Sequence, residues 1–111
     1  VMALGPKGEI WIIECKSSRA DFQSDHKWQD YLQWCDRYFW AVDQEFPNEI
    51  LPGNTGIIMA DAYDAAILRM GPEHRLAPAR RKVMIQKFAR HAARLAQASR
   101  DPGVARFNTS S

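Results

Sequence analysis

The chain has 111 residues, of which 46% are hydrophobic and 25% are charged, so its composition is that of one globular domain and excludes a disordered chain. Its longest apolar run, Tyr38 to Val42, is far too short to span a bilayer, which excludes a membrane-spanning segment. The net charge of +2 is unevenly divided: residues 1–74 hold 6 Lys and Arg against 12 Asp and Glu, whereas residues 75–111 hold 9 against 1.

The basic C-terminal third allows two interpretations. Positive charge gathered in one part of a chain favours a polyanionic partner, with nucleic acid as the first candidate. The alternative is a solvated basic helix that packs on the acidic body of the same protein. Charge alone does not separate the two.

The two cysteines, Cys15 and Cys35, have neither a metal-binding nor a redox spacing, and they form no disulfide framework. We expect both to be buried thiols and the protein to work in a reducing, cytoplasmic setting. The chain opens on the apolar residue Val1 without a start-like context, so we expect further residues to precede it in a longer protein.

The first elements expected along the chain are two strands. Residues 1–4 and 9–16 are strand-like and flank a Gly-Pro-Lys-Gly turn at 5–8, which predicts a hairpin. Side chains alternate between the two faces of a strand, so Ile12, Glu14 and Lys16 share one face. The opposite face is expected to belong to the core and carries Trp11, Ile13 and Cys15.

Two short helices are expected next. Ser18 and Asp21 have the spacing of a capping box, and Ser24 with Asp25 offers a second cap. Helical spacing then predicts a buried stripe of Trp28, Tyr31, Leu32 and Cys35. Two other tryptophans fall off this stripe and are expected to be exposed or to form a dimer contact, namely Trp34 and Trp40.

The second half of the chain predicts three strands and a long helix. The strands are expected at 38–42, 56–60 and 65–70, the last two as a hairpin, and the helix from Ala79 to about Ser99. This order predicts an α/β fold with a central mixed β-sheet flanked by helices. We expect a single domain over residues 1–103, followed by a polar tail over 104–111.

Glu14 and Lys16 carry the chemistry that the sequence suggests. Phosphodiester hydrolysis needs a hard divalent cation to polarise the phosphate, and Mg²⁺ takes carboxylate and carbonyl oxygens as ligands. Glu14 and the main-chain carbonyl of Cys15 can each supply an oxygen, and Lys16 can stabilise developing negative charge. One carboxylate makes a poor Mg²⁺ site, so a second is needed from a neighbouring strand. The alternative is a surface pair of opposite charges at a strand end.

At this point the sequence resembles a known family. A hairpin, the run Ile-Ile-Glu-Cys-Lys-Ser-Ser at 12–18 and then a helix are similar to the core of the PD-(D/E)XK nuclease superfamily. More narrowly, essentially the whole chain resembles the bacterial MmcB-like family of DNA-repair-related proteins. The segments that carry this likeness most specifically are 11–18, 21–22, 25 with 27–28, 30–32, 35–39 and 76–81.

The resemblance implies a restriction-endonuclease-like core and a DNA nuclease that depends on Mg²⁺ or Mn²⁺. It assigns Glu14 as a metal ligand and Lys16 as the catalytic lysine. The superfamily's first-strand Asp is expected immediately before Val1, and its usual N-terminal helix is also missing from this chain. We therefore expect the chain as given to bind Mg²⁺ weakly and to cut poorly.

Residues near this pair also have two interpretations. Ser17 and Ser18 are expected as helix caps that can also contact a phosphate, and Lys27 as a lysine that is solvated or reaches the site. Asp21 and Asp25 are expected to favour the helix dipole rather than to bind metal. In the C-terminal helix, phosphate contacts are expected from Arg80, Arg81, Lys87, Arg90 and Arg94.

Three functions therefore remain open. The first is a metal-dependent DNA endonuclease or related repair protein. The second is a nucleic-acid-binding module that has the nuclease fold without its catalysis. The third is an interaction or homodimerisation domain whose aromatic residues form the interface.

Overall fold

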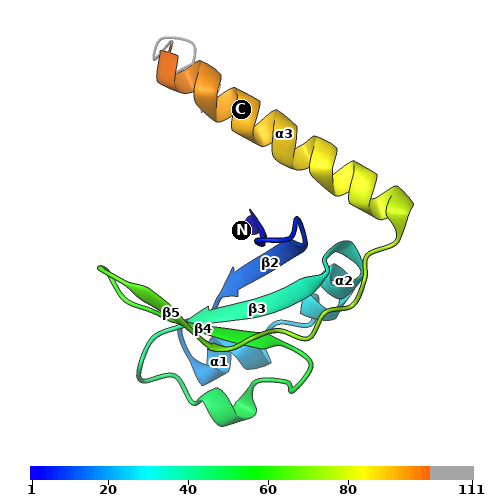
Figure 1. Cartoon of the computed structure of the whole chain (residues 1–111). Helices are drawn as coiled ribbons and strands as arrows, with labels where there is room; N and C mark the ends of the chain where they lie inside the picture. Colours follow the sequence, from blue (N-terminus) through cyan, green and yellow to red (C-terminus); the bar gives the residue numbers. More distant parts are fainter. Residues whose placement is uncertain (101–111) are drawn as a thin grey trace. The chain divides into compact units, whose positions relative to one another are not determined.

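The computed structural model of the chain describes residues 1–100 (Figure 1). Two compact units divide the chain, Val1–Arg81 and Lys82–Ser111. The first unit holds a β-sheet with its short helices, and the long helix α3 (Pro78–Arg100) begins there and continues into the second. The expected tail, 104–111, lies outside the described residues.

A five-stranded mixed sheet forms the centre of the first unit, as the strand pattern predicted. Its strands lie in the order of the sequence, and the inner pairs β2–β3 and β3–β4 are parallel, whereas the outer pairs β1–β2 and β4–β5 are antiparallel. The strands are β1 (Met2–Leu4), β2 (Ile10–Cys15), β3 (Arg37–Val42), β4 (Gly56–Ala60) and β5 (Ala65–Arg69).

Two short helices follow β2. Ser18 caps the first, as expected, whereas Ser24 ends the first helix and Lys27, not Ser24 or Asp25, is the N-cap of the second. Helix α1 (Arg19–Gln23) begins where the Ser18 hydroxyl accepts the N–H of Asp21 at 3.1 Å. Helix α2 (Trp28–Tyr31) begins where the Oδ1 of Asp25 accepts the N–H groups of Lys27 and Trp28. Short 3₁₀ turns complete the unit as η1 (Leu32–Trp34) and η2 (Asn48–Ile50).

An aromatic core fills the space between the sheet and these helices. Tyr38 and Trp40 of β3 pack edge to face against each other, and both contact Trp28 of α2. Phe22 of α1 meets the Trp40 ring at 86°. Because cross-strand partners share a face and Glu14 pairs with Trp40, the covered face is the one that carries Glu14 and Lys16.

Three expectations about burial are wrong. Cys15 is exposed, because it ends β2 on the face opposite to α1 and α2, where Trp11 and Ile13 are half-buried. Trp40 is buried, and its indole N–H donates to the Thr55 hydroxyl at 3.0 Å. Tyr31 is exposed because α2 is only one turn long before the chain tightens into η1.

The strand β4 starts at a glycine for a steric reason. A Cβ on Gly56 would lie 2.4 Å from the Phe39 ring and 2.6 Å from the backbone nitrogen of Gly71. Side chains larger than hydrogen are therefore excluded where the 71–77 loop crosses the start of the sheet. Within residues 1–100, no helix is both long and apolar enough to cross a membrane.

Candidate functional site

The side chain of Lys16 is largely covered, which argues against a surface pair at the strand end. Its side chain is only 8% exposed, and its ammonium lies 2.9 Å from the Oδ2 of Asp25 and 3.8 Å from the Oδ1 of Asp21. Burial of an ammonium is costly unless it is paired, and the two carboxylates supply the pairing. The sequence therefore folds the loop after β2 around this lysine.

Backbone hydrogen bonds hold both aspartates in place. The Oδ2 of Asp21 accepts the N–H of Ser17 at 2.9 Å and also the hydroxyl of Ser17. Asp25 uses one oxygen for the start of α2 and the other for Lys16. Asp21 lies in the first turn of α1, as expected, whereas Asp25 precedes α2 and accepts its first N–H groups. Each aspartate also faces the lysine, which the sequence did not predict.

These contacts fix the charge states of the cluster. Burial would lower the pKa of Lys16, but the hydrogen bond to Asp25 and the carboxylates around it raise that pKa. Burial would likewise raise the pKa of Asp25, but its hydrogen bonds from Lys16 and from the N–H of Lys27 lower it. The N–H of Ser17 is the largest cause of the lowered pKa of Asp21. At neutral pH the cluster is therefore one cation between two anions.

Glu14 and Tyr38 lie on the same covered face. Glu14 is half-buried, and its carboxylate has no hydrogen bond or ion pair within residues 1–100, although its charge contributes to the raised pKa of Lys16. The Tyr38 hydroxyl is buried without a hydrogen-bond partner in the described part of the chain. Burial raises the pKa of Tyr38, and the charges of Glu14 and Asp25 raise it further, so both carboxylates lie within electrostatic reach.

Sequence reasoning missed Tyr38 as a neighbour of the Glu14–Lys16 pair. Tyr38 pairs with Ile12 across the parallel β2–β3 ladder, two positions before the Glu14–Trp40 pair. The register of a parallel pair that is joined through two helices depends on how those helices pack. No local signal in the sequence reports it.

The donors in residues 1–100 do not complete a Mg²⁺ site. This part of the chain has no group of three or more His, Cys, Asp or Glu side chains placed to hold a metal. Glu14 offers one carboxylate, whereas Asp21 and Asp25 are already occupied by Lys16 and by backbone N–H groups. Mg²⁺ is usually held by one or two carboxylates with several waters, so Glu14 alone supplies the smallest number of protein ligands that such sites have.

The remaining predicted neighbours are arranged as follows. Ser18 is the α1 cap, and Ser17 binds Asp21 through its N–H and hydroxyl. Cys15, whose carbonyl was expected to bind metal, ends β2 opposite Ala41. Lys27 is exposed and its side chain has no ion pair among the described residues, so its reach toward the site stays a prediction.

The first turn of α3 is bound to the sheet through a buried aspartate. Arg81 donates two hydrogen bonds to Asp36, at 2.6 and 3.0 Å, and the Asp36 side chain is fully buried. Asp36 also accepts the N–H groups of Ile10 and Leu76. Arg80 donates to the Gln33 carbonyl and lies 5.1 Å from the centre of the Trp34 ring. Both arginines therefore have partners within the first unit, which their spacing did not indicate.

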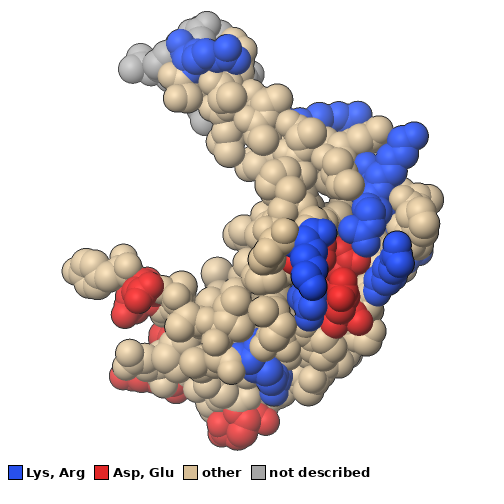
Figure 2. Space-filling model, in the orientation of Figure 1, with Lys and Arg blue, Asp and Glu red and all other residues tan. Residues whose placement is uncertain are grey.

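The later basic residues of α3 are exposed. They are Lys87, Arg90 and Arg94, and residues 78–100 contain no Asp or Glu. In Figure 2 the visible part of α3 accordingly carries Lys and Arg side chains and no acidic ones. This arrangement suits contact with phosphate groups without sequence reading.

Comparisons with known proteins agree with the resemblance noted in the sequence. A family model described as "DNA repair protein MmcB-like" matches residues 1–102. The solved structure of a protein of unknown function from Silicibacter pomeroyi is 75% identical, with a TM-score of 0.84, over 91% of this chain and 69% of that chain. No curated protein matches the sequence.

Proposed function

The chain belongs to the MmcB-like family of DNA repair proteins, and from this we propose that it acts on DNA as a phosphodiester-cleaving repair nuclease with a restriction-endonuclease-like core. Glu14 and Lys16 are the residues to which we assign the chemistry. The observation that carries the proposal is the buried Lys16, held by Asp25 and Asp21 on the same sheet face as Glu14. A strand-end pair without a role would leave its lysine in water.

The cluster can act on a phosphate in two ways. The Lys16 ammonium is fixed and charged, so it can stabilise negative charge that develops on a phosphate oxygen. Glu14 keeps its carboxylate oxygens without hydrogen-bond partners in residues 1–100, so they are available to accept a proton or a ligand. Because the metal donors present are incomplete, we derive no step through a metal ion.

A second candidate function is a DNA-binding module that has this fold but does not cut. The same incomplete set of metal donors favours it. The exposed basic residues of α3, Lys87, Arg90 and Arg94, would then supply most of the affinity. The nuclease requires the Glu14 carboxylate for cleavage, whereas the binding module does not require it.

Glu14→Gln is the sharper variant for testing the first proposal. Lys16→Ala would remove one partner of a buried ion pair and destabilise the fold by about 3 kcal/mol, so lost cutting could mean lost folding. Glu14 has no described hydrogen bond to lose, and its charge is the smallest of the causes that raise the pKa of Lys16, so Glu14→Gln should lower the unfolding temperature far less than Lys16→Ala. The matched control is Glu45→Gln, an exposed carboxylate without a hydrogen bond or ion pair among the described residues.

The assay is cleavage of linear, nicked, flapped and branched DNA with Mg²⁺ or Mn²⁺, on the chain itself and on an N-terminally extended protein. Cutting that Glu14→Gln abolishes and Glu45→Gln preserves supports the nuclease. DNA binding that weakens with salt, without cutting by either form, refutes the nuclease and favours the binding module. If DNA is neither bound nor cut, both proposals are refuted.

A further inference from the structure

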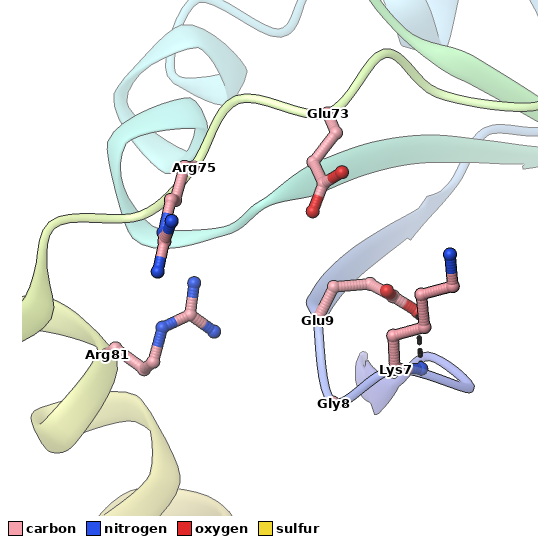
Figure 3. Close-up of a pocket in the computed structure, with 6 residues that line it drawn as sticks. All are labelled: Lys7, Gly8, Glu9, Glu73, Arg75 and Arg81. Carbon is pink, nitrogen blue, oxygen red and sulfur yellow. Dashed lines mark hydrogen bonds between the residues drawn. The ribbon is translucent and has the colours of Figure 1, made fainter.

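A polar pocket opens at the opposite end of β2 from Lys16. It encloses about 580 Å³ and is lined by Lys7, Gly8, Glu9, Glu73, Arg75 and Arg81 (Figure 3). Glu9 and Glu14 are five residues apart along a strand that rises about 3.3 Å per residue, so the pocket lies roughly 16 Å from the candidate nuclease site. All six residues belong to the first unit, Val1–Arg81.

Two guanidinium groups face each other at one side of this pocket. Figure 3 shows Arg75 from the 71–77 loop and Arg81 from the first turn of α3 pointing toward one another. Arg81 is held by the buried Asp36 carboxylate, which balances its charge and fixes its orientation. Arg75 has no hydrogen bond or ion pair with any residue in 1–100. Arg75 therefore lacks a counter-ion, and an anion bound between Arg75 and Arg81 would supply one.

The acidic residues of the pocket are already engaged. Glu9 is buried and turns its carboxylate into the hairpin, where it accepts the N–H of Lys7 at 3.4 Å. Glu73 lies 3.6 Å from Arg37. Its half-exposed side chain reaches into the pocket between the arginines and the hairpin (Figure 3). The lining keeps one more cation than anion, and the two arginines and Lys7 face the space from both sides.

We propose that this pocket binds the phosphate monoester of a nucleotide, with the phosphate between Arg75 and Arg81. Planar guanidinium groups match phosphate oxygens in pairs. The Oε2 of Glu73 pairs with Arg37, which leaves its Oε1 as an acceptor for a sugar hydroxyl or a base amino group. The volume suits one nucleotide, because small-molecule pockets span about 300–1,000 Å³. The source is either a free nucleotide or the 5′-phosphorylated end of a strand.

Binding of matched oligonucleotides tests the proposal, without metal so that cleavage plays no part. A fluorescent single strand with a 5′-phosphate is compared with the same strand ending in a 5′-hydroxyl, and dAMP is titrated by calorimetry. We expect the wild-type chain to prefer the 5′-phosphate or to bind dAMP, and Arg75→Gln to lose about tenfold in that preference or affinity. The exposed Arg90→Gln is the control and should weaken both strands equally.

The outcomes separate the two sources and the two proposals. A 5′-phosphate preference without dAMP binding assigns the strand end, and dAMP binding without that preference assigns the free nucleotide. Equal binding of both strands with no heat from dAMP overturns the pocket assignment, yet leaves DNA binding intact. A preference that survives in Arg75→Gln also overturns it, because the phosphate would then lie elsewhere.

Discussion

Asp36→Asn should destabilise the protein strongly, because one buried carboxylate holds three parts of the chain together. Asp36 accepts the N–H of Ile10 at 2.7 Å, the N–H of Leu76 at 2.8 Å and two hydrogen bonds from Arg81. Asparagine has nearly the same shape, but it carries no charge and turns an N–H₂ group toward donors. At least one buried donor then loses its partner, and Arg81 loses its counter-ion.

The magnitude follows from these contacts. Breaking a buried, hydrogen-bonded ion pair by changing one partner costs about 3–5 kcal/mol. The Arg81 side chain is 29% exposed, so water compensates part of the lost ion pair. The lower end of this range, about 3 kcal/mol, is therefore expected. A domain of this size is stable by only about 5–15 kcal/mol, so the variant should lose a large part of its stability.

The effect should also depend on pH. Burial alone would raise the pKa of Asp36, but the hydrogen bonds from Arg81, Ile10 and Leu76 lower it below its ordinary value. A carboxyl whose pKa is lower in the folded state contributes stability above its unfolded pKa of about 3.9. That contribution is lost as the pH falls through the folded pKa. The difference in free energy of unfolding between wild type and Asp36→Asn should therefore become smaller below about pH 4.

Urea unfolding followed by tryptophan fluorescence, at pH 7 and at steps down to pH 3, measures both effects. At pH 7 the midpoint should fall by at least about 1 M, since m is about 1–3 kcal/mol per M for small proteins. The control is Asp30→Asn, an exposed aspartate in the first turn of α2 whose side chain has no hydrogen bond or ion pair among the described residues. A midpoint for Asp36→Asn within the range of this control, or a gap that widens in acid, refutes the reasoning.

Two further predictions rest on the core. Burial raises the pKa of the Cys35 thiol to about 12, whereas Cys15 is exposed. A thiol reagent at pH 8 should therefore modify only Cys15 in the native protein and both cysteines in denaturant. Modification of Cys35 in the native protein, located by mass spectrometry, would contradict this. Thr55→Val should lower the free energy of unfolding in urea by about 1–3 kcal/mol, because the Trp40 indole N–H loses its buried acceptor. Thr55→Ser keeps the hydroxyl and should keep most of the stability. Equal losses in the two variants would show that the hydroxyl is irrelevant.

Local patterns were sufficient to predict the strands and the helices, but not the 3₁₀ turns η1 and η2. The strand predicted at 56–60 is observed at Gly56–Ala60, because a Pro- and Gly-rich loop and a turn bound it on either side. The helix expected from Ala79 begins one residue earlier at Pro78, a residue favoured in the first turn. Trp40 was misjudged because a helical period was applied to it, although on β3 the period of two places it beside Glu14.

The candidate site could be predicted only in part. The alternation along β2 correctly placed Glu14 and Lys16 on one face, but that face was not recognised as the covered one. The ion pair of Lys16 depends on how the loop after β2 folds back. The Arg81–Asp36 pair joins residues 45 positions apart, and such a contact has no local signature in one sequence.

The divided use of Asp25 fixes Lys16 before any ligand arrives. One oxygen of this carboxylate starts helix α2 and the other holds the ammonium, so the aspartate cannot follow the lysine without unwinding the helix start. An ammonium has three N–H donors, so an anion can bind Lys16 without displacing Asp25. The lysine therefore needs no rearrangement to accept a ligand, and a substrate that binds elsewhere on the protein meets a charge whose position is already set.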